Sequence, residues 1–201
     1  MRILFARHGE SEANLQQIIS NRDLHHPLTE RGIMQATALT EKLSNSFNVK
    51  MIWSSPILRA KETAEIVAKR LGLSPRISPA LREFDCGEIE GRADPEAWQI
   101  YRKLVRAWDE DQAYEQRILP DGESFNDMKA RFVPFVNHLL ESNRTLSGDI
   151  LLITHGGLLY QMLPLVVSNI DRAYTKAKRL GNCDFYITEI QNGELVHIGN
   201  M

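Results

Sequence analysis

The sequence predicts an α/β fold in which a mostly parallel sheet is covered by helices on both faces. Three observations support this prediction. Apolar runs of strand length alternate with stretches of helical periodicity, the run DILLIT at 149–154 has the strongest strand pattern, and a hairpin pattern closes the chain. Strands that alternate with helices are typical of parallel sheets, whose strands are buried on both faces.

The first half of the chain predicts two strands, each followed by a helix. RILFA at 2–6 has the pattern of a buried strand, and Thr29 is placed to cap the next helix. The apolar face of that helix is expected to consist of Ile33, Ala36, Leu39 and Leu43. VKMIW at 49–53 predicts the second strand, and Pro56 stands where the second helix is expected to begin. Its apolar positions are Ala60, Ala64, Val67 and Leu71.

The second half continues this alternation with one interruption. Strands are expected at 76–78, 149–154, 184–190 and 194–198, the last two joined by the turn QNG. Helices are expected over the apolar stripe from Trp98 to Trp108, from Ser124 onward, and over 157–167. Pro134 lies inside the helix after Ser124 and predicts a kink. We expect a single domain over 1–201, with the interruption at about 85–120 forming a lid or insertion over one end of the sheet.

Composition and charge narrow the classes of function. The 201 residues are 43% hydrophobic and 25% charged, and the formal net charge of −2 gives no support for binding nucleic acid or an anionic membrane. No apolar run reaches the length of a signal peptide or a membrane span. The two cysteines, Cys86 and Cys183, match no zinc or disulfide pattern. We expect a cytoplasmic protein without metal or cofactor, and no pattern indicates an oligomeric state.

Two of the predicted strands end in similar motifs. ILFA runs into RHG at 7–9, and ILLIT runs into HGG at 155–157. Ligands of open α/β sheets bind beyond the carboxyl ends of the strands, so we expect His8 and His155 to converge. The glycines allow backbone N–H groups to approach an anion closely. Arg59, in the first turns of the helix after the second strand, comes to the same edge, and its guanidinium suits phosphate oxygens.

Six segments carry a resemblance to a known family. They are ARHGESEAN at 6–14, HPLTERG at 26–32, SSPILRAKETA at 54–64, LREFDCGEIEG at 81–91, DGESFNDMKAR at 121–131 and LLITHGG at 151–157. In these segments, and in their order, the chain resembles the histidine phosphatase superfamily, in the branch that includes cofactor-dependent phosphoglycerate mutases and related phosphatases. The resemblance implies a three-layer α/β/α sandwich, with a mostly parallel central sheet and an antiparallel edge strand.

The resemblance also implies a role for each site residue. His8 would be the phosphorylated nucleophile, and Glu83 would be the proton donor. The phosphoryl group would be bound by Arg7, Asn14, Arg59, His155 and Gly156. Arg7, Arg59 and His155 would in addition neutralise the phosphoryl oxygens during the reaction.

The residue types suit this chemistry. A neutral imidazole is a good nucleophile, and the charges of Arg7 and Arg59 should lower the pKa of His8 and keep it neutral. Glu83 lies between the apolar residues Leu81 and Phe84, which should raise its pKa so that it retains a proton for the leaving oxygen. Because arginine and histidine already supply positive charge, we expect no metal ion to take part.

Two departures from the family bear on the substrate. The loop SNRDLHH at 20–26 lacks the glycine that many members carry, so its contacts with phosphate are open, and His25 and His26 could reach toward the substrate. Tyr160 stands where many members have an arginine. The 85–120 insertion should shape the leaving-group pocket.

The sequence favours a metal-independent phosphomonoester hydrolase that acts on a small phosphorylated metabolite. The alternatives are a cofactor-dependent phosphoglycerate mutase and a binding or regulatory module with little turnover.

Several other residues are expected to be structural. Cys86, His138 and His197 should serve packing and local hydrogen bonds rather than catalysis. The stripe of Trp98, Tyr101 and Trp108 should belong to the core, with an outer edge that could roof the site. Along the same helix, the expected solvated face consists of Arg102, Lys103 and Arg106.

Overall fold

The computed structural model of the protein describes residues 1–22 and 25–201. Asp23 and Leu24, which belong to the glycine-free loop at 20–26, lie outside the described residues. Among the helices of the described part, none combines the length and the apolar character that a membrane span requires.

The centre of the fold is a six-stranded sheet with the strand order β3-β2-β4-β1-β5-β6. The strands are β1 Arg2–Arg7, β2 Val49–Ser54, β3 Arg76–Ile77, β4 Asp149–Thr154, β5 Phe185–Gln191 and β6 Glu194–Asn200. The pairs β3·β2, β2·β4 and β4·β1 are parallel, whereas β5 runs antiparallel to β1 and forms a hairpin with β6. The predicted mostly parallel sheet with an antiparallel edge is confirmed, and the edge consists of this hairpin.

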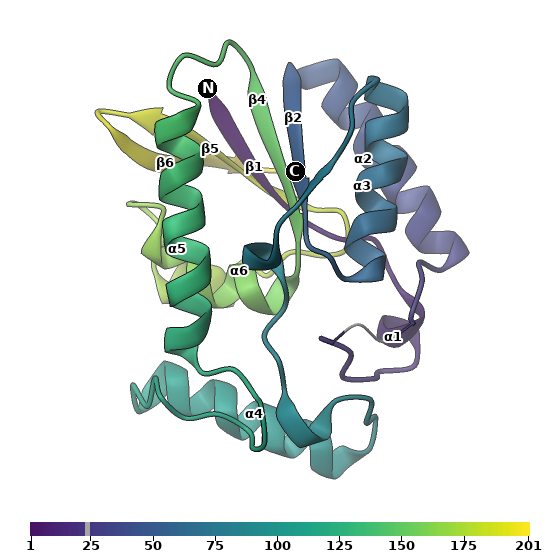
Figure 1. Ribbon diagram of the computed structural model, residues 1–201, viewed down its shortest axis with the longest axis vertical. Helices are drawn as coiled ribbons and strands as arrows, with labels where there is room; N and C mark the ends of the chain where they lie inside the picture. The colour runs from purple at the N-terminus through teal and green to yellow at the C-terminus, as the bar shows by residue number, and fades with distance from the viewer. Residues whose placement is uncertain (23–24) are drawn as a thin grey trace.

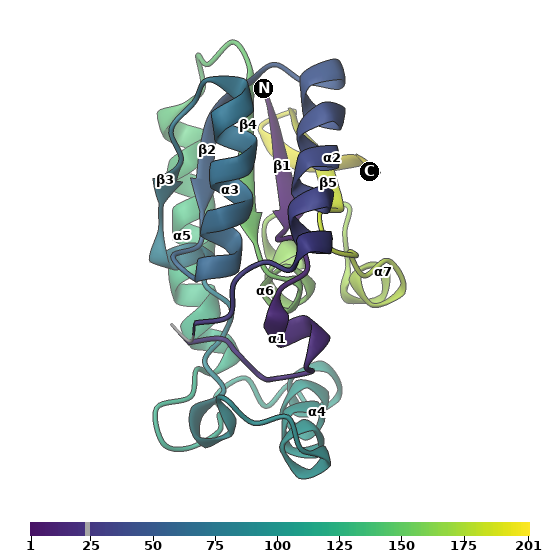
Figure 2. The ribbon, with the colours of Figure 1, turned by 90° about the vertical axis from the view of Figure 1, so that its right-hand side faces the viewer.

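Helices cover both faces of the sheet (Figures 1 and 2). They are α1 Glu12–Leu15, α2 Glu30–Ser46, α3 Leu58–Leu71, α4 Pro95–Glu110, α5 Phe125–Ser142, α6 Gly156–Met162 and α7 Arg172–Ala177. Short 3-10 turns occupy Pro79–Leu81, Gly87–Ile89 and Leu163–Leu165. The helices α2 and α3 lie on one face and α5 lies on the other, which is the expected three-layer α/β/α arrangement.

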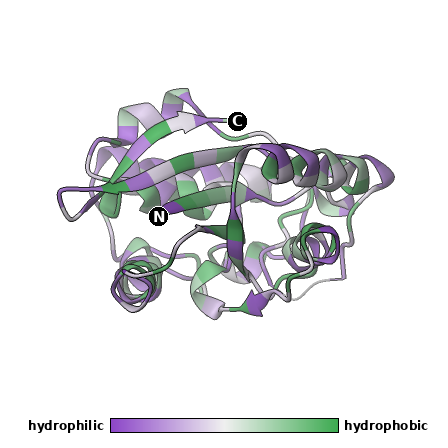
Figure 3. Ribbon diagram, turned by 90° about the horizontal axis from the view of Figure 1, so that it is seen from above, coloured by the Kyte–Doolittle hydropathy of each residue, from purple (hydrophilic) through white to green (hydrophobic). Residues whose placement is uncertain are grey.

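The alternation of side chains along the strands explains the two faces. In β1, Ile3 and Phe5 pack into the cluster beneath α5, while Leu4 and Ala6 pack into the cluster beneath α2 and α3. All four side chains are fully buried. Figure 3 shows hydrophobic residues along the central strands and a mixture of both kinds along the helices. The strands are therefore buried on both sides, as a parallel sheet requires.

Side-chain caps begin the long helices where the sequence predicts them. The hydroxyl of Thr29 accepts a hydrogen bond from the backbone N–H of Gly32 at the start of α2. Ser124 and Asp127 form a reciprocal capping box at the start of α5. These caps pair backbone N–H groups that have no partner inside the helix.

Three local expectations differ from the structure. Ile33 was expected on the buried face of α2, but its side chain is 48% exposed. Pro56 lies two residues before α3 rather than in its first turn. The helix expected over 157–167 ends at Met162, where Pro164 in the next turn cannot continue the backbone ladder. Pro134 lies inside α5 as expected, and the helix continues past it over Phe125–Ser142; the kink stays a prediction.

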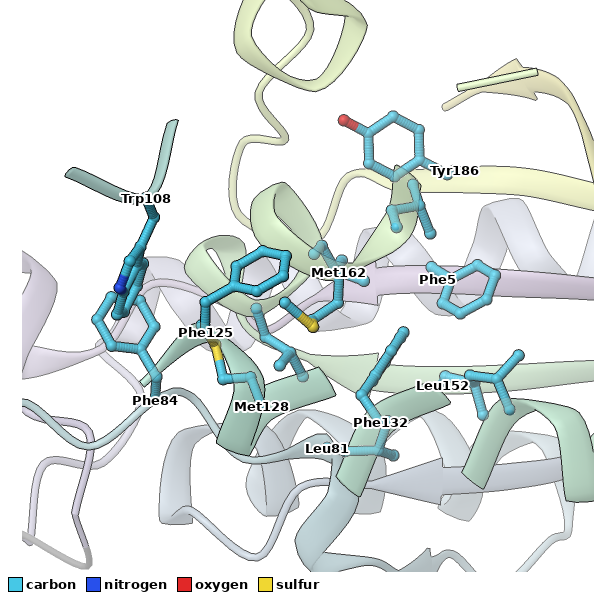
Figure 4. Close-up of a cluster of buried hydrophobic side chains, with 14 of the residues drawn as sticks. Phe5, Leu81, Phe84, Trp108, Phe125, Met128, Phe132, Leu152, Met162 and Tyr186 are labelled. Carbon is cyan, nitrogen blue, oxygen red and sulfur yellow. The ribbon is translucent and has the colours of Figure 1, made fainter. Parts of the chain in front are cut away.

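The stretch 85–120 lies beyond the carboxyl ends of β1 and β4, at the bottom of Figures 1 and 2. Its helix α4 shares one hydrophobic cluster with the sheet. Figure 4 follows this cluster from Phe5 and Leu152 in the strands, through Phe132 in α5, to Phe84 and Trp108. The rings of Phe84 and Trp108 meet edge to face, with centroids 5.1 Å apart. The α4 layer therefore rests on the core next to the strand ends.

Candidate active site

The ends of β1 and β4 bring the two predicted histidines together. These strands are parallel neighbours, with Arg7 opposite Thr154, so His8 and His155 follow at the same edge of the sheet. The two ring centroids are 5.1 Å apart. Both side chains are buried, His8 with 3% and His155 with 0% of its surface exposed. The convergence that the sequence predicts is therefore present in the fold.

His8 is held as a neutral ring with a defined tautomer. Its Nδ1 lies 2.7 Å from the carbonyl oxygen of Gly9, which can only accept, so Nδ1 carries the proton. Its Nε2 accepts a hydrogen bond of 2.9 Å from Nε of Arg59. Burial, followed by the charges of Arg59 and Arg7, lowers the pKa of His8 well below its ordinary value. The Nε2 lone pair therefore points toward the arginine side of the site.

Arg59 connects the two histidines. It is the second residue of α3 and is only 4% exposed. Besides its bond to His8, it donates from Nη1 to the carbonyl oxygen of Ser20 at 2.5 Å and from Nη2 to Nδ1 of His155 at 3.2 Å. Burial lowers the pKa of Arg59 to about 10, which leaves it charged near neutral pH. A cation is thus fixed against the free nitrogen of His8.

His155 lies behind Arg59. Because its Nδ1 accepts from Arg59, its Nε2 carries the proton and donates to the hydroxyl of Ser55 at 2.8 Å. Burial and the charge of Arg59 lower the pKa of His155 well below its ordinary value. His155 does not line the pocket that the other site residues form, so its contact with that pocket runs through Arg59. Ser55 was missed in the sequence, although it also comes directly after a strand, β2.

Glu83 reaches the same place from the segment before α4. Its side chain is 7% exposed. One carboxyl oxygen accepts from the backbone N–H of Gly157 at 2.8 Å, and the other accepts from the N–H of Phe84 at 3.2 Å. Burial raises the pKa of Glu83 above its ordinary value, against the opposing effect of the Gly157 hydrogen bond. The raised pKa agrees with the expectation from its apolar neighbours.

The carboxyl group of Glu83 lies so close to residue 157 that only glycine fits there. A Cβ atom on this residue would lie 2.8 Å from both carboxyl oxygens of Glu83. We expect Gly157→Ala to displace Glu83 and to lower kcat by about 100-fold, which is the usual cost of misplacing a reacting group by about 1 Å. The control is Gly199→Ala, where the nearest atom to a new Cβ is a flexible methyl group of Ile187 at 3.8 Å. Equal activity of the two variants would contradict the assignment of Glu83 to the reaction.

Arg7 presents an unsatisfied donor to the site. Its Nη1 donates to the carbonyl oxygen of Leu180 at 3.0 Å. Its Nε is the one buried side-chain nitrogen or oxygen of the described residues that has no hydrogen-bond partner. Gly156 lies next to it, since a Cβ there would be in van der Waals contact, at 3.4 Å, with Nε and Cδ of Arg7. A buried N–H without a partner is costly, which suits a group that binds an anion.

Asn14 lies on the short helix α1, which brings it to the site. Its Oδ1 accepts from the backbone N–H and the hydroxyl of Ser11, at 3.1 and 3.2 Å, as part of a capping box. These bonds fix the amide by its oxygen, so the Nδ2 donor is the end left for a ligand. Asn14 lines the same pocket as Arg7 and His8.

The pocket has a volume of about 260 Å³. Six of the seven predicted site residues line it, namely Arg7, His8, Asn14, Arg59, Glu83 and Gly156. Trp98, Tyr101 and Val105 of α4 line it as well, so the 85–120 stretch does contribute to its wall. Among the described residues of the lining, neither His25 nor His26 occurs.

A half-buried carboxylate that the sequence patterns did not single out holds the 20–22 segment in place. Glu90 accepts backbone hydrogen bonds from Asn21 at 2.8 Å and from Cys86 at 2.9 Å. Through Asn21 it fixes the neighbouring carbonyl group of Ser20, which accepts from Arg59. Glu90 lies in the motif LREFDCGEIEG, seven residues after Glu83. Its place in that motif is the sequence feature that could have identified it as part of the site.

The residues expected to be structural take no part in the candidate site. Cys86 is fully buried in the cluster beneath α5, and its sulfur accepts from Asn21. His138 is exposed on α5, and His197 contacts Tyr174 and Asn200 at the far hairpin. The side chains of Arg102, Lys103 and Arg106 are exposed, although Arg102 lines a second hollow beside Trp98.

Comparisons with known proteins agree with this geometry. The family model of the histidine phosphatase superfamily (branch 1) matches residues 3–199. The protein called "Probable phosphoglycerate mutase GpmB" from Salmonella arizonae is 28% identical over 205 residues, which cover 99% of this chain and 89% of that protein. The protein of the same name from Yersinia pestis is 29% identical over 195 residues, which cover 95% of this chain and 86% of that protein.

Solved structures with the same fold include two phosphatases. A mycobacterial glucosyl-3-phosphoglycerate phosphatase, solved with VO3, has a TM-score of 0.82 and 25% identity and covers 98% of this chain and 96% of its own. The α-ribazole phosphatase of Shigella flexneri has a TM-score of 0.78 and 27% identity, with coverage of 98% and 95%.

Proposed function

The chain belongs to the histidine phosphatase superfamily, whose members are phosphatases or mutases, and from this premise we propose that it hydrolyses small phosphomonoesters without a metal ion, through a phosphohistidine intermediate. The observation that carries the proposal is the environment of His8. Its Nε2 is unprotonated, Arg59 adjoins it, and the half-buried Arg7, whose Nε–H has no hydrogen-bond partner, lines the same pocket. These groups suit a nucleophile surrounded by donors for phosphate oxygens.

The first half of the reaction forms a bond between His8 and phosphorus. Nε2 of His8 attacks the phosphorus atom, and the bond between phosphorus and the ester oxygen breaks. The N–H of Arg59 that meets Nε2 is then placed to donate to a phosphoryl oxygen, together with Arg7 and Asn14. Glu83, protonated because of its raised pKa, gives its proton to the departing oxygen. The carbonyl oxygen of Gly9 stabilises the positive charge that the ring acquires.

The second half returns the enzyme to its initial state. Glu83, now ionised, takes a proton from water as the water oxygen attacks the phosphorus atom of phospho-His8. The bond between Nε2 and phosphorus breaks, and inorganic phosphate leaves. His155 supports both steps by holding Arg59, and Ser55 holds His155 in turn.

The alternative to hydrolysis is a mutase reaction. The relatives named probable phosphoglycerate mutase would return the phosphoryl group to a second hydroxyl group. A mutase has to keep water away from its intermediate. The lid at 85–120 is modest in length, and the loop at 20–26 lacks the glycine that would let the backbone fold tightly over a substrate. Two of the structural neighbours are named phosphatases. These observations favour water as the acceptor.

The test is a panel of phosphomonoesters assayed in the presence of EDTA, with phosphate release as the measurement. We expect activity to survive the chelator, because Arg7 and Arg59 supply the positive charge at the phosphoryl site. In the same enzyme sample, conversion of 3-phosphoglycerate to 2-phosphoglycerate should be slower than phosphate release, even when 2,3-bisphosphoglycerate is supplied.

Two results would contradict this proposal. Isomerisation that is orders of magnitude faster than phosphate release from every ester would favour the mutase. Complete loss of activity in EDTA, with recovery on adding magnesium or zinc, would show that a metal takes part. A binding or regulatory module would form no phospho-His8 after incubation with any ester.

The pKa shifts predict an acidic optimum for esters of alkyl alcohols. The rate should rise with pH through the lowered pKa of His8, because only the neutral ring attacks, and fall through the raised pKa of Glu83, because only the acid donates. For p-nitrophenyl phosphate, whose leaving group needs no proton, the alkaline fall should weaken. Ionisation of the phosphate group affects both esters, so the difference between the two pH profiles reports Glu83. Identical alkaline limbs would contradict the assignment.

A further inference from the structure

The part of the pocket away from His8 has a different chemistry from the phosphoryl end. Its wall is mostly apolar and aromatic, with Trp98, Tyr101, Val105 and Leu159 among its members. Tyr101 stacks on Phe84 with ring centroids 5.5 Å apart, so this wall is built on the core. One cationic side chain, Arg179, joins it.

The backbone on both sides of Arg179 is fixed. The carbonyl oxygen of Lys178 accepts from the hydroxyl of Tyr186 at 2.5 Å, and that of Leu180 accepts from Nη1 of Arg7 at 3.0 Å. Arg179 is therefore the neighbour of Leu180, whose carbonyl oxygen is hydrogen-bonded to Arg7 of the phosphoryl site. These two bonds fix the backbone next to Arg179, whose exposed side chain lines the pocket.

The side chain of Arg179 also has a rigid support. Its guanidinium carbon lies 4.7 Å from the centre of the Tyr160 ring. Tyr160 is held in turn, because its hydroxyl donates to Asp109 at 2.5 Å. Arg179 is thus held over a fixed ring at the rim of the pocket.

A second arginine, Arg172, contacts the same Tyr160 ring, and its bonds indicate a structural role. Arg172 lies 5.2 Å from the centre of the Tyr160 ring, pairs with Asp109 at 3.6 Å and donates to the carbonyl oxygen of Tyr160. By contrast, no ion pair or hydrogen bond among the described residues involves the Arg179 side chain. Arg172 fixes the ring, whereas the side chain of Arg179 is exposed and its donors are accessible to a ligand in the pocket.

We propose that Arg179 binds a second anionic group of the substrate, and that the preferred substrates are phosphomonoesters whose small, largely apolar or aromatic alcohol part carries a carboxylate. This inference rests on the proposed phosphatase function and adds its substrate class. The aromatic wall would contact the carbon skeleton, while the planar fork of Arg179 suits a carboxylate. A pocket of about 260 Å³ limits the alcohol to a small one. Tyr160 supplies the platform for the Arg179 guanidinium.

The experiment compares two matched esters, 4-carboxyphenyl phosphate and 4-carbamoylphenyl phosphate, which differ in charge but hardly in shape. The measurement is the ratio of their kcat/KM values in the wild type and in Arg179→Met, Arg179→Lys and Arg106→Met. Their intrinsic reactivities differ, but this difference cancels when the ratios of two variants are compared. Arg106 is the matched control, since its side chain is exposed on α4 and its one ion pair within the described part of the chain is with Glu110, at 3.9 Å.

We expect Arg179→Met to lower the carboxylate-to-amide ratio about tenfold or more, the size of a charged hydrogen bond. Arg179→Lys should keep part of the preference, and Arg106→Met should keep all of it. Equal ratios in the wild type and in folded Arg179→Met would overturn the inference while leaving the phosphatase proposal intact. If the wild type hydrolysed neither ester nor any member of the panel, the phosphatase proposal would fail, and this inference with it.

Discussion

Replacement of His8 by alanine should lower kcat by about 10,000-fold or more, the range found when a catalytic nucleophile is removed. The physical reason is that the lone pair of His8 Nε2 lies beside Arg59 in the pocket, whereas His155, the other histidine that contacts Arg59, does not line that pocket. Rates of phosphate release measure the effect. Mass spectrometry of enzyme quenched during turnover should detect a phosphoryl group on the wild type and none on the variant.

The fold should survive this change, because the core around β1 consists of its apolar residues and not of His8. Circular dichroism and thermal unfolding check this point. The control is His138→Ala, which removes an exposed imidazole from α5 and should leave the rate unchanged. A folded His8→Ala protein with activity near that of the wild type would overturn the phosphohistidine mechanism.

Glu83→Gln should separate two classes of ester. Loss of a general acid costs about 100- to 10,000-fold, and we expect that loss in kcat/KM for esters of alkyl alcohols. For p-nitrophenyl phosphate, whose oxygen leaves without a proton, the loss should be much smaller. We specify kcat/KM because it reports phosphoryl transfer to His8, whereas kcat also contains the attack of water, for which Glu83 is the proposed base.

Two controls accompany this variant. Glu88→Gln makes the same change at an exposed position of the same segment and should leave both esters unaffected. Thermal unfolding tests for disturbance, because both carboxyl oxygens of Glu83 accept backbone hydrogen bonds and the amide of glutamine can replace only one acceptor. Equal losses with both classes of ester would count against Glu83 as the proton donor.

Local patterns were sufficient for most of the fold. The apolar runs of β1 and β4 predicted buried strands of a mostly parallel sheet, and Thr29 marked the start of α2. Predictions failed where the outcome depended on distant contacts. Ile33 has helical spacing with the buried residues of α2, yet its side chain is exposed, because the width of the buried stripe depends on what packs against the helix.

The sequence also predicted that the chemistry would gather at one edge of the sheet, since the residues after parallel strands emerge on the same side. It did not reveal Ser55, Glu90 or Arg179 as parts of that site. Each acts through partners far along the chain: Ser55 through His155, Glu90 through the backbone of Asn21, and Arg179 through the ring of Tyr160.

By itself, the sequence determined the α/β class, the family and the set of residue types available for phosphoryl chemistry. These properties follow from periodicity and from motifs that are contiguous in the chain. Only the tertiary structure decided which nitrogen of His8 is free, because the proton sits where the carbonyl oxygen of Gly9 accepts it. The structure also placed His155 behind Arg59, although the sequence resemblance implied that it binds the phosphoryl group directly. Protonation and orientation depend on burial and on neighbours in space, and a one-dimensional pattern does not contain either of them.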